Sequence, residues 1–292
     1  MQEPQLMQID GHTLAALSYN SDIDSTPLVF IHGFTTNIAY WARSQVPAID
    51  ERFRWYSLSL PGHYPAAFPE GFTDAELTPD LFARLLVPAI QELVGTQSVI
   101  LVGHSTGGFA ALLIAEAAPE MVKGIICIGG FVNGDWSGMS GRMQKQVMRG
   151  ALGRAMVKVQ LRMIGLHPRL LRSSLKYYVA DLDAVSAWPE LDASIADLFV
   201  YTRRLSTDAM ISYLTQMPSI SISDRLSGIA TPTLVLTGER DLAYPRDESA
   251  LVHEGLPNSQ LVVLEGVGHL PMIEEPQEYQ EAITTWLAEV VG

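Results

Sequence analysis

Several features that would assign the chain to whole classes of protein are scarce or missing. Its one cysteine, Cys127, excludes a disulfide within the chain, and the surrounding apolar run GIICIGG favours a buried, inert thiol. The opening stretch MQEPQLMQIDGH has no cationic segment followed by an apolar core, so no signal peptide is visible. No apolar run approaches the ~20 residues of a membrane-spanning helix. We therefore expect a soluble, cytoplasmic protein with no transmembrane segment.

Positive charge is also in short supply. Nineteen Lys and Arg residues face 32 Asp and Glu residues, which gives a formal net charge of −13. Contacts with nucleic-acid phosphates need clustered cations, so this balance argues against general nucleic-acid binding. The 292 residues are 48% hydrophobic and 17% charged, which is enough apolar material to bury a sizeable core.

Short apolar, β-branched runs alternate with helical stretches along most of the chain. We expect strands at residues 13–19, 27–31, 54–60, 98–102, 122–128, 233–237 and 261–264. We expect helices at about 40–49, 79–94, 109–118, 246–254 and 276–290. This alternation predicts an α/β fold with a mostly parallel β-sheet that helices cover on both faces.

The alternation stops between about residues 133 and 217, where only helix-like pieces occur. We predict a helical cap (133–217) inserted between two strands of a core formed by 1–132 and 218–292. From residue 136 to 180 the cap carries nine basic residues and no acidic one: Arg142, Lys145, Arg149, Arg154, Lys158, Arg162, Arg169, Arg172 and Lys176. They form either a solvated helical face or a site for an anionic leaving group, an acidic carrier protein or a membrane surface.

One short motif dominates the sequence. Ser105 lies in Gly-His-Ser-Thr-Gly, which fits G-x-S-x-G, after the expected strand SVILV and before the alanine-rich stretch FAALLIAEAA. A strand–turn–helix context lifts the hydroxyl out of the sheet, close to a helix N-terminus whose partial positive charge favours an oxyanion. We predict that Ser105 is a nucleophile.

A serine nucleophile needs a base and an acid that orients the base. His269 follows the last expected strand on a glycine-flanked loop and is the predicted base. Asp241 follows the strand TLVLT, and the order Ser105, Asp241, His269 is the one found in α/β-hydrolases. Asp135 and Glu239 remain rival acids.

An oxyanion hole needs two backbone N–H groups aimed at one point. We expect one from Thr106, after the nucleophile, and one from Phe34, where Gly33 allows a tight turn after the strand PLVFI. The histidines are scattered and no cofactor motif occurs, so we predict neither a metal nor a cofactor.

Taken together, five motifs resemble the α/β-hydrolase superfamily along nearly the whole chain: HGF at 32–34, LPGH at 60–63, GHSTGG at 103–108, TGERD at 237–241 and GVGH at 266–269. The resemblance implies the same roles for Ser105, Asp241, His269, Phe34 and Thr106. Tyr64-Pro65 departs from the Gly-Ser that often follows LPGH in the family, so the substrate of a subfamily does not carry over. Related epoxide hydrolases and haloalkane dehalogenases have an aspartate in place of the serine.

A triad with an oxyanion hole performs acyl transfer. We expect a carboxylesterase-like hydrolase that acts on a small-molecule ester with a small or medium apolar acyl group. A thioesterase, a lactonase, a carbon–carbon bond hydrolase and a non-catalytic binding protein are the alternatives. Seven methionines of the cap either line an adaptable apolar pocket or pack the cap on the core: Met139, Met143, Met148, Met156, Met163, Met210 and Met217.

Overall fold

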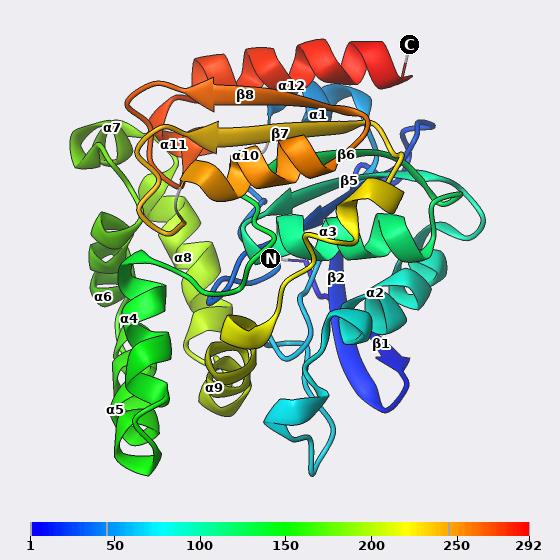
Figure 1. Cartoon of the computed structure of the whole chain (residues 1–292). Coiled ribbons are helices and arrows are strands. Elements are labelled where there is room, and N and C mark those ends of the chain that lie inside the picture. Colours follow the sequence, from blue (N-terminus) through cyan, green and yellow to red (C-terminus); the bar gives the residue numbers. More distant parts are fainter. Residues whose placement is uncertain (1, 45, 245, 292) are drawn as a thin grey trace.

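The fold is built on an eight-stranded β-sheet, seen in a computed structural model that describes residues 2–44, 46–244 and 246–291 (Figure 1). The strands are β1 (Gln5–Ile9), β2 (His12–Tyr19), β3 (Leu28–Ile31), β4 (Trp55–Leu58), β5 (Val99–His104), β6 (Val122–Ile128), β7 (Thr233–Gly238) and β8 (Ser259–Leu264). Their order across the sheet is β1-β2-β4-β3-β5-β6-β7-β8. All pairs from β4 to β8 are parallel, which confirms the predicted α/β fold.

Strand β1 was not expected from the sequence. It pairs antiparallel with β2, which in turn pairs antiparallel with β4, so this edge of the sheet differs from the rest. The turn between β1 and β2 is made by Asp10 and Gly11, with φ angles of 50° and 79°. Two positive φ angles match the tight hairpin turn that Asp-Gly favours. The Asp-Gly pair was therefore the available signal for this hairpin.

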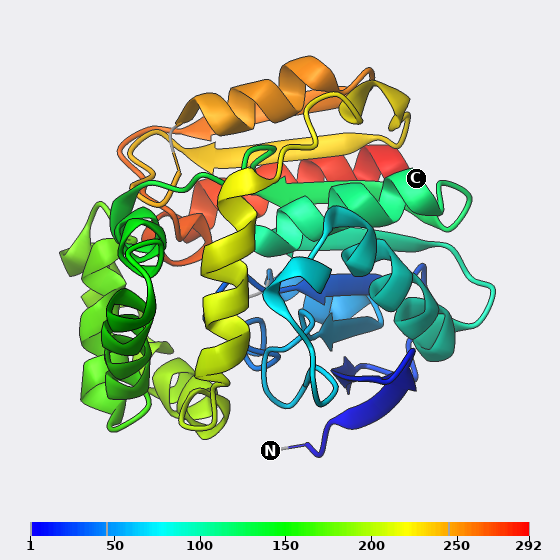
Figure 2. The ribbon, with the colours of Figure 1, turned by 60° about the horizontal axis from the view of Figure 1, so that its bottom comes forward.

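Helices cover both faces of the sheet (Figures 1 and 2). Buried side chains place α2 (Pro79–Val94), α3 (Thr106–Ala117) and α10 (Arg246–Gly255) in one core cluster, and α1 (Pro47–Arg52) and α12 (Pro276–Val291) in the other. Helix α2 begins where the sequence predicts, because Thr78 Oγ1 accepts a hydrogen bond from Leu81 N and Pro79 starts the first turn. No helix in the described part of the chain is both long and apolar enough to cross a membrane.

One expected helix is wrong. The sequence predicted a helix at about 40–49, of which residue 45 lies outside the described residues. Residues 38–44 instead form turns, with Tyr40 N donating to Asn37 O and Ala42 N to Ala39 O. The helix begins only at Pro47, which lacks an N–H and suits a first helical position.

Between β6 and β7 the chain forms a group of helices at one end of the sheet (Figure 2). They are α4 (Gly138–Val147), α5 (Ala151–Ile164), α6 (Pro168–Ser174), α7 (Leu182–Ala187), α8 (Leu191–Thr202) and α9 (Thr207–Gln216). We call residues 133–217 the helical segment. Its two ends meet, because Gly134 N donates to Ile220 O and Ile222 N donates to Val132 O. The segment thus leaves and rejoins the sheet at one place.

Candidate active site

Ser105 lies on a strained turn between β5 and α3. Its φ and ψ are 58° and −119°, a conformation that non-glycine residues rarely adopt. The turn needs glycine on either side, since a Cβ on Gly103 would lie 2.3 Å from Gly107 O and one on Gly107 would lie 2.1 Å from Ile31 O. The G-x-S-x-G pattern is thus a packing requirement of this turn, and it presents the hydroxyl at the carboxyl end of the sheet.

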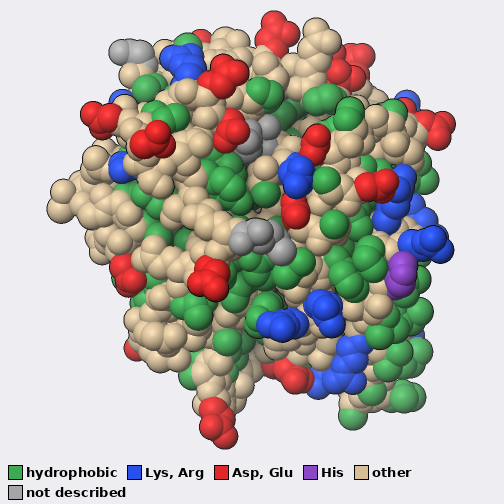
Figure 3. All heavy atoms as spheres, turned by 180° about the vertical axis from the view of Figure 1, so that it is seen from behind, with side chains coloured by type: hydrophobic (Ala, Val, Ile, Leu, Met, Phe, Trp, Pro, Cys, Tyr) green, Lys and Arg blue, Asp and Glu red, His purple; other side chains and the backbone are tan. Residues whose placement is uncertain are grey.

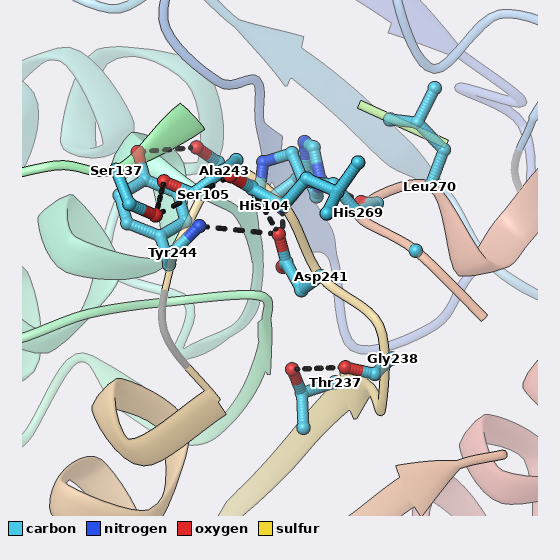
Figure 4. Close-up of polar contacts among 12 residues, drawn as sticks. His104, Ser105, Ser137, Thr237, Gly238, Asp241, Ala243, Tyr244, His269 and Leu270 are labelled. Carbon is cyan, nitrogen blue, oxygen red and sulfur yellow. Dashed lines mark hydrogen bonds and ion pairs between the residues drawn. The ribbon is translucent and has the colours of Figure 1, made fainter. Parts of the chain in front are cut away.

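The predicted acid and base meet beside this serine (Figure 4). His269 Nδ1 lies 2.6 Å from Asp241 Oδ2, and both side chains are buried. The other carboxylate oxygen, Oδ1, accepts hydrogen bonds from the backbone N–H of Ala243 at 2.8 Å and of Tyr244 at 3.3 Å. Because a carboxylate accepts at Nδ1, the neutral imidazole carries its proton there and leaves Nε2 free to act as a base.

The two rival acids lie elsewhere. Asp135 is exposed and has no hydrogen bond or ion pair with any described residue. Glu239 Oε2 accepts a hydrogen bond from Gly266 N at 3.1 Å, which ties the loop after β7 to the loop after β8. Of the three carboxylates, only Asp241 is paired with His269.

The hydroxyl of Ser105 has an unexpected partner. Ser105 Oγ lies 3.0 Å from the hydroxyl of Tyr244. Among the described residues, Tyr244 is the one hydrogen-bond partner of the Ser105 side chain. Burial raises the pKa of Tyr244 above its usual range, so the phenol is neutral and can donate its proton. Sequence reasoning missed Tyr244. Tyr244 lies three residues after Asp241, on a loop at the same sheet edge, and this spacing could have indicated that it reaches the site.

The predicted oxyanion donors lie on either side of the serine. Thr106 begins α3, so its N–H has no acceptor within the helix. Phe34 N, on the loop after β3, has no hydrogen-bond partner among the residues described. Buried His32 fixes this loop, because its Nδ1 donates to Gly33 O at 2.8 Å and its Nε2 accepts from Leu60 N at 3.2 Å. Burial lowers the pKa of His32 to about 4, which keeps the ring neutral.

The loop that carries His269 is held from two sides. His104 Nε2 donates to His269 O at 2.9 Å, and burial keeps the pKa of His104 well below its usual value. Buried Glu274 accepts hydrogen bonds from Gly268 N and Leu270 N, which flank the histidine. Neither holding residue was anticipated from the sequence.

The helical segment is tied to the same loop. The carboxylate of Glu274 also accepts from Ala180 N at 2.7 Å and Asp181 N at 3.1 Å, both in the helical segment. In addition, His269 N donates to Tyr178 O at 2.7 Å. The position of the imidazole therefore depends on contacts with the helical segment as well as with the sheet.

A cavity of about 470 Å³ lies between the sheet edge and the helical segment. Ser105, His269, Phe34 and Tyr244 line its inner end. Its outer wall is mainly apolar and comes from the helical segment: Met139, Met143, Leu161, Met163, Ile164, Leu170, Leu171 and Tyr178. A cavity of this size and polarity suits a small molecule with an apolar part.

The methionines divide into three groups. Met139, Met143 and Met163 line the cavity. Met210 and Met217 are fully buried and pack the segment on the core, whereas Met148 and Met156 are exposed. Both roles considered from the sequence therefore occur, and the exposed pair has neither.

Two further kinds of site considered from the sequence are a metal centre and a reactive thiol. The described residues contain no cluster of three His, Cys, Asp or Glu side chains that could hold a metal ion. Burial raises the pKa of the Cys127 thiol to about 12, so the thiol stays protonated and unreactive.

A serine on a strand–turn–helix beside an acid–base pair, at the carboxyl edge of a mainly parallel sheet, defines a class of protein. The model of the alpha/beta hydrolase fold family matches residues 26–276, so the chain belongs to that family. It is 25% identical to a putative carbamate hydrolase RutD of Pseudomonas syringae pv. syringae, over 91% of this chain and 95% of that protein.

Two further proteins extend the comparison. The chain is 25% identical to a pimeloyl-[acyl-carrier protein] methyl ester esterase of Aeromonas hydrophila subsp. hydrophila, over 88% of this chain and 93% of that protein. A thermophilic esterase from Thermogutta terrifontis has a similar structure, with a TM-score of 0.75, 21% identity and full coverage of both chains. The relatives are hydrolases of the same family, and the solved structure supports the fold.

Proposed function

We propose that the protein is a serine hydrolase that cleaves carboxylic esters of small or medium apolar acyl groups through an acyl-enzyme. The observation that carries the proposal is the buried Asp241–His269 pair beside Ser105, at the inner end of an apolar cavity. In the proposed reaction Ser105 Oγ attacks the ester carbonyl while His269 Nε2 takes its proton. Asp241 stabilises the imidazolium that forms.

The tetrahedral intermediate then carries a negative oxygen. The N–H groups of Phe34 and Thr106 donate to it, and the N-terminus of α3 adds favourable partial charge. His269 returns the proton to the departing alcohol, which leaves an acyl group on Ser105. Water, activated by the same histidine, releases the acid.

The choice of an ester with an apolar acyl group is supported by two observations. The wall that the helical segment contributes consists mainly of methionine, leucine, isoleucine and tyrosine side chains, with a few polar ones that include Gln160 and Lys176. We infer that this segment acts as a cap that selects the acyl group. The Aeromonas relative, which is a methyl ester esterase, is consistent with attack on a carboxylic ester.

A panel of p-nitrophenyl esters, lactones and acyl thioesters, assayed with the wild type and with Ser105→Ala, tests this proposal. We expect the highest kcat/KM for p-nitrophenyl esters of short to medium acyl chains. Ser105→Ala should lower kcat by about 10⁶-fold, as for other triad serines, with little change in stability. If Ser105→Ala keeps a tenth of the wild-type turnover, Ser105 is not the nucleophile.

The same panel separates the alternatives. Preference for lactones or acyl thioesters would keep the triad and change the substrate class. A binding protein that has lost catalysis would turn over none of the substrates and would not be labelled by a fluorophosphonate probe, which needs an activated serine.

A further inference from the structure

Helix α5 has apolar residues on two faces. On its inner face Val157 and Leu161 are buried against the rest of the helical segment. On its outer face apolar residues three or four positions apart form a line along the helix and its C-terminal end. We call them the outer stripe: Leu152, Met156, Val159, Met163 and Leu166, which are between 48% and 74% exposed. Single exposed apolar residues are common, but a continuous row marks an interaction surface.

The stripe lies among cations. Ion pairs within the described residues neutralise three of the nine basic side chains in 136–180, by joining Arg154 to Asp74, Lys158 to Asp208 and Arg172 to Asp192. The other six have no carboxylate partner in the described part of the chain: Arg142, Lys145, Arg149, Arg162, Arg169 and Lys176. Figure 3 shows Lys and Arg side chains gathered with hydrophobic ones on the side of the molecule where the helical segment lies. This surface is positive although the chain as a whole is acidic.

The outer stripe is continuous with the cavity. Met163 belongs to the stripe, is 48% exposed and also lines the cavity that contains Ser105. Leu170, on the neighbouring helix α6, is likewise both part-exposed and a lining residue. Apolar residues exposed on the outside of α5 and α6 thus also line the cavity that contains Ser105, together with polar residues such as Gln160 and Lys176.

These observations favour one partner over two others. A second copy of the chain would bring six unpaired cations against the same six in a symmetric interface, which is unfavourable. An acidic carrier protein would satisfy the cations, but it would need a matching apolar groove for the stripe. A helix with apolar residues on its outer face and cations beside them is typical of helices that lie on anionic membranes.

We propose that the outer stripe and its surrounding cations dock on an anionic lipid surface, from which an apolar ester passes into the cavity. The inference rests on the proposed esterase function, because it assigns the source of that enzyme's substrate. Docking on the surface needs no membrane-spanning helix.

Flotation of the full chain with vesicles tests the proposal. We expect binding to phosphatidylcholine vesicles that contain phosphatidylglycerol, and little binding to phosphatidylcholine alone. Replacing Arg149, Arg162 and Arg169 together by Gln should lower the partition coefficient about 100-fold, since each cation contributes roughly a factor of five at an anionic surface.

The stripe itself is tested separately. Leu152→Gln combined with Val159→Gln should lower the partition coefficient at least tenfold, because both apolar side chains then stay in water. Glutamine preserves helix propensity at these exposed positions. The matched controls are Lys123→Gln in β6 and Leu251→Gln in α10, both outside the helical segment; they change an exposed cation and a part-exposed leucine and should leave flotation unchanged.

Two readouts separate failure of docking from failure of the esterase. Hydrolysis of a water-soluble p-nitrophenyl acetate should be the same in the docking variants and the wild type, and Ser105→Ala should float like the wild type. Equal flotation of wild type and docking variants would overturn the proposal. So would retention on an immobilised acidic acyl-carrier protein without vesicle binding, or dimerisation that Leu152→Gln abolishes.

Discussion

The sheet edge and the helical segment use their side chains differently. At the sheet edge the acid–base pair is buried and hydrogen-bonded: Asp241 holds His269 with one oxygen and two backbone N–H groups with the other. On the outer surface of the helical segment, apolar side chains lie in solvent beside cations that have no carboxylate partner in the part of the chain that the structure describes. The first arrangement fixes the atoms that would react in the proposed mechanism, whereas the second leaves a surface free to contact a partner. Substitutions at the sheet edge should therefore change the rate of the reaction, and substitutions in the helical segment should change what is bound.

At the sheet edge, the largest effect on the reaction rate is expected for Asp241→Asn. The amide would leave the imidazole in the wrong tautomer, and kcat should fall by about 10⁴-fold while the fold is kept. Asp135→Asn is the matched control and should be silent, because Asp135 is exposed and unpaired among the described residues. Steady-state kinetics with a p-nitrophenyl ester measures both variants. A loss with Asp135→Asn and none with Asp241→Asn would move the acid to the earlier strand.

Buried histidines at the sheet edge should also make its stability depend on pH. The pKa of His32 is about 4 in the folded chain because the ring is buried, against about 6.5 when unfolded. The unfolded state binds the proton more readily, so stability is fully present above pH 6.5 and is lost as the pH falls toward 4. A shift of this size corresponds to about 3 kcal/mol in the free energy of unfolding.

Urea unfolding between pH 7.5 and pH 4.5 measures this loss. His32→Gln should weaken the dependence, since glutamine can still accept from Leu60 N but does not titrate, while burial keeps the pKa of His63 and of His104 low in the variant as well. His167→Gln, at an exposed histidine of the helical segment, should leave it unchanged. Identical pH dependence in wild type and His32→Gln would show that His32 is not the group responsible.

In the helical segment, Met143 and Met148 offer a matched pair. Met143 lines the cavity, whereas Met148 is 65% exposed and lies outside its lining. Met143→Ala should lower kcat/KM for a medium-chain ester about tenfold relative to the acetate, because an apolar pocket contact is worth roughly 1–3 kcal/mol. Met148→Ala should not change this ratio. Equal effects on both esters would place Met143 outside the acyl site.

Local features of the site could be predicted from the sequence, whereas contacts between distant segments could not. The turn at Ser105 was predictable because close packing requires glycine at positions 103 and 107, and such a requirement leaves a short local pattern. Glu274 was not predictable, since it joins the loop around His269 to residues 180 and 181, and no local pattern records a contact over that distance. The helix expected at 40–49 failed because successive turns compete with an α-helix there.

Tyr244 is hydrogen-bonded to Ser105, the proposed nucleophile, although it belongs neither to the G-x-S-x-G motif nor to the proposed triad. Its hydroxyl lies 3.0 Å from Ser105 Oγ, and the neutral phenol can donate this hydrogen bond. As acceptor, Ser105 keeps its own proton free, but the bond occupies a lone pair of Oγ that the proposed attack on a carbonyl would need. Since a net hydrogen bond is worth about 0.5–1.5 kcal/mol, Tyr244→Phe should raise kcat/KM by a factor of about three, the smallest of these effects.

Tyr40→Phe is the matched control for this last substitution. Tyr40 also lines the cavity, but its hydroxyl contacts Met272 Sδ at 3.6 Å and not the serine. Its removal should leave kcat/KM unchanged. A hundredfold loss with Tyr244→Phe would have the opposite meaning, because a loss of that size is typical of a donor to the developing oxyanion. Tyr244 would then stabilise the transition state together with Phe34 and Thr106, and the bond to Ser105 would be a feature of the resting enzyme only.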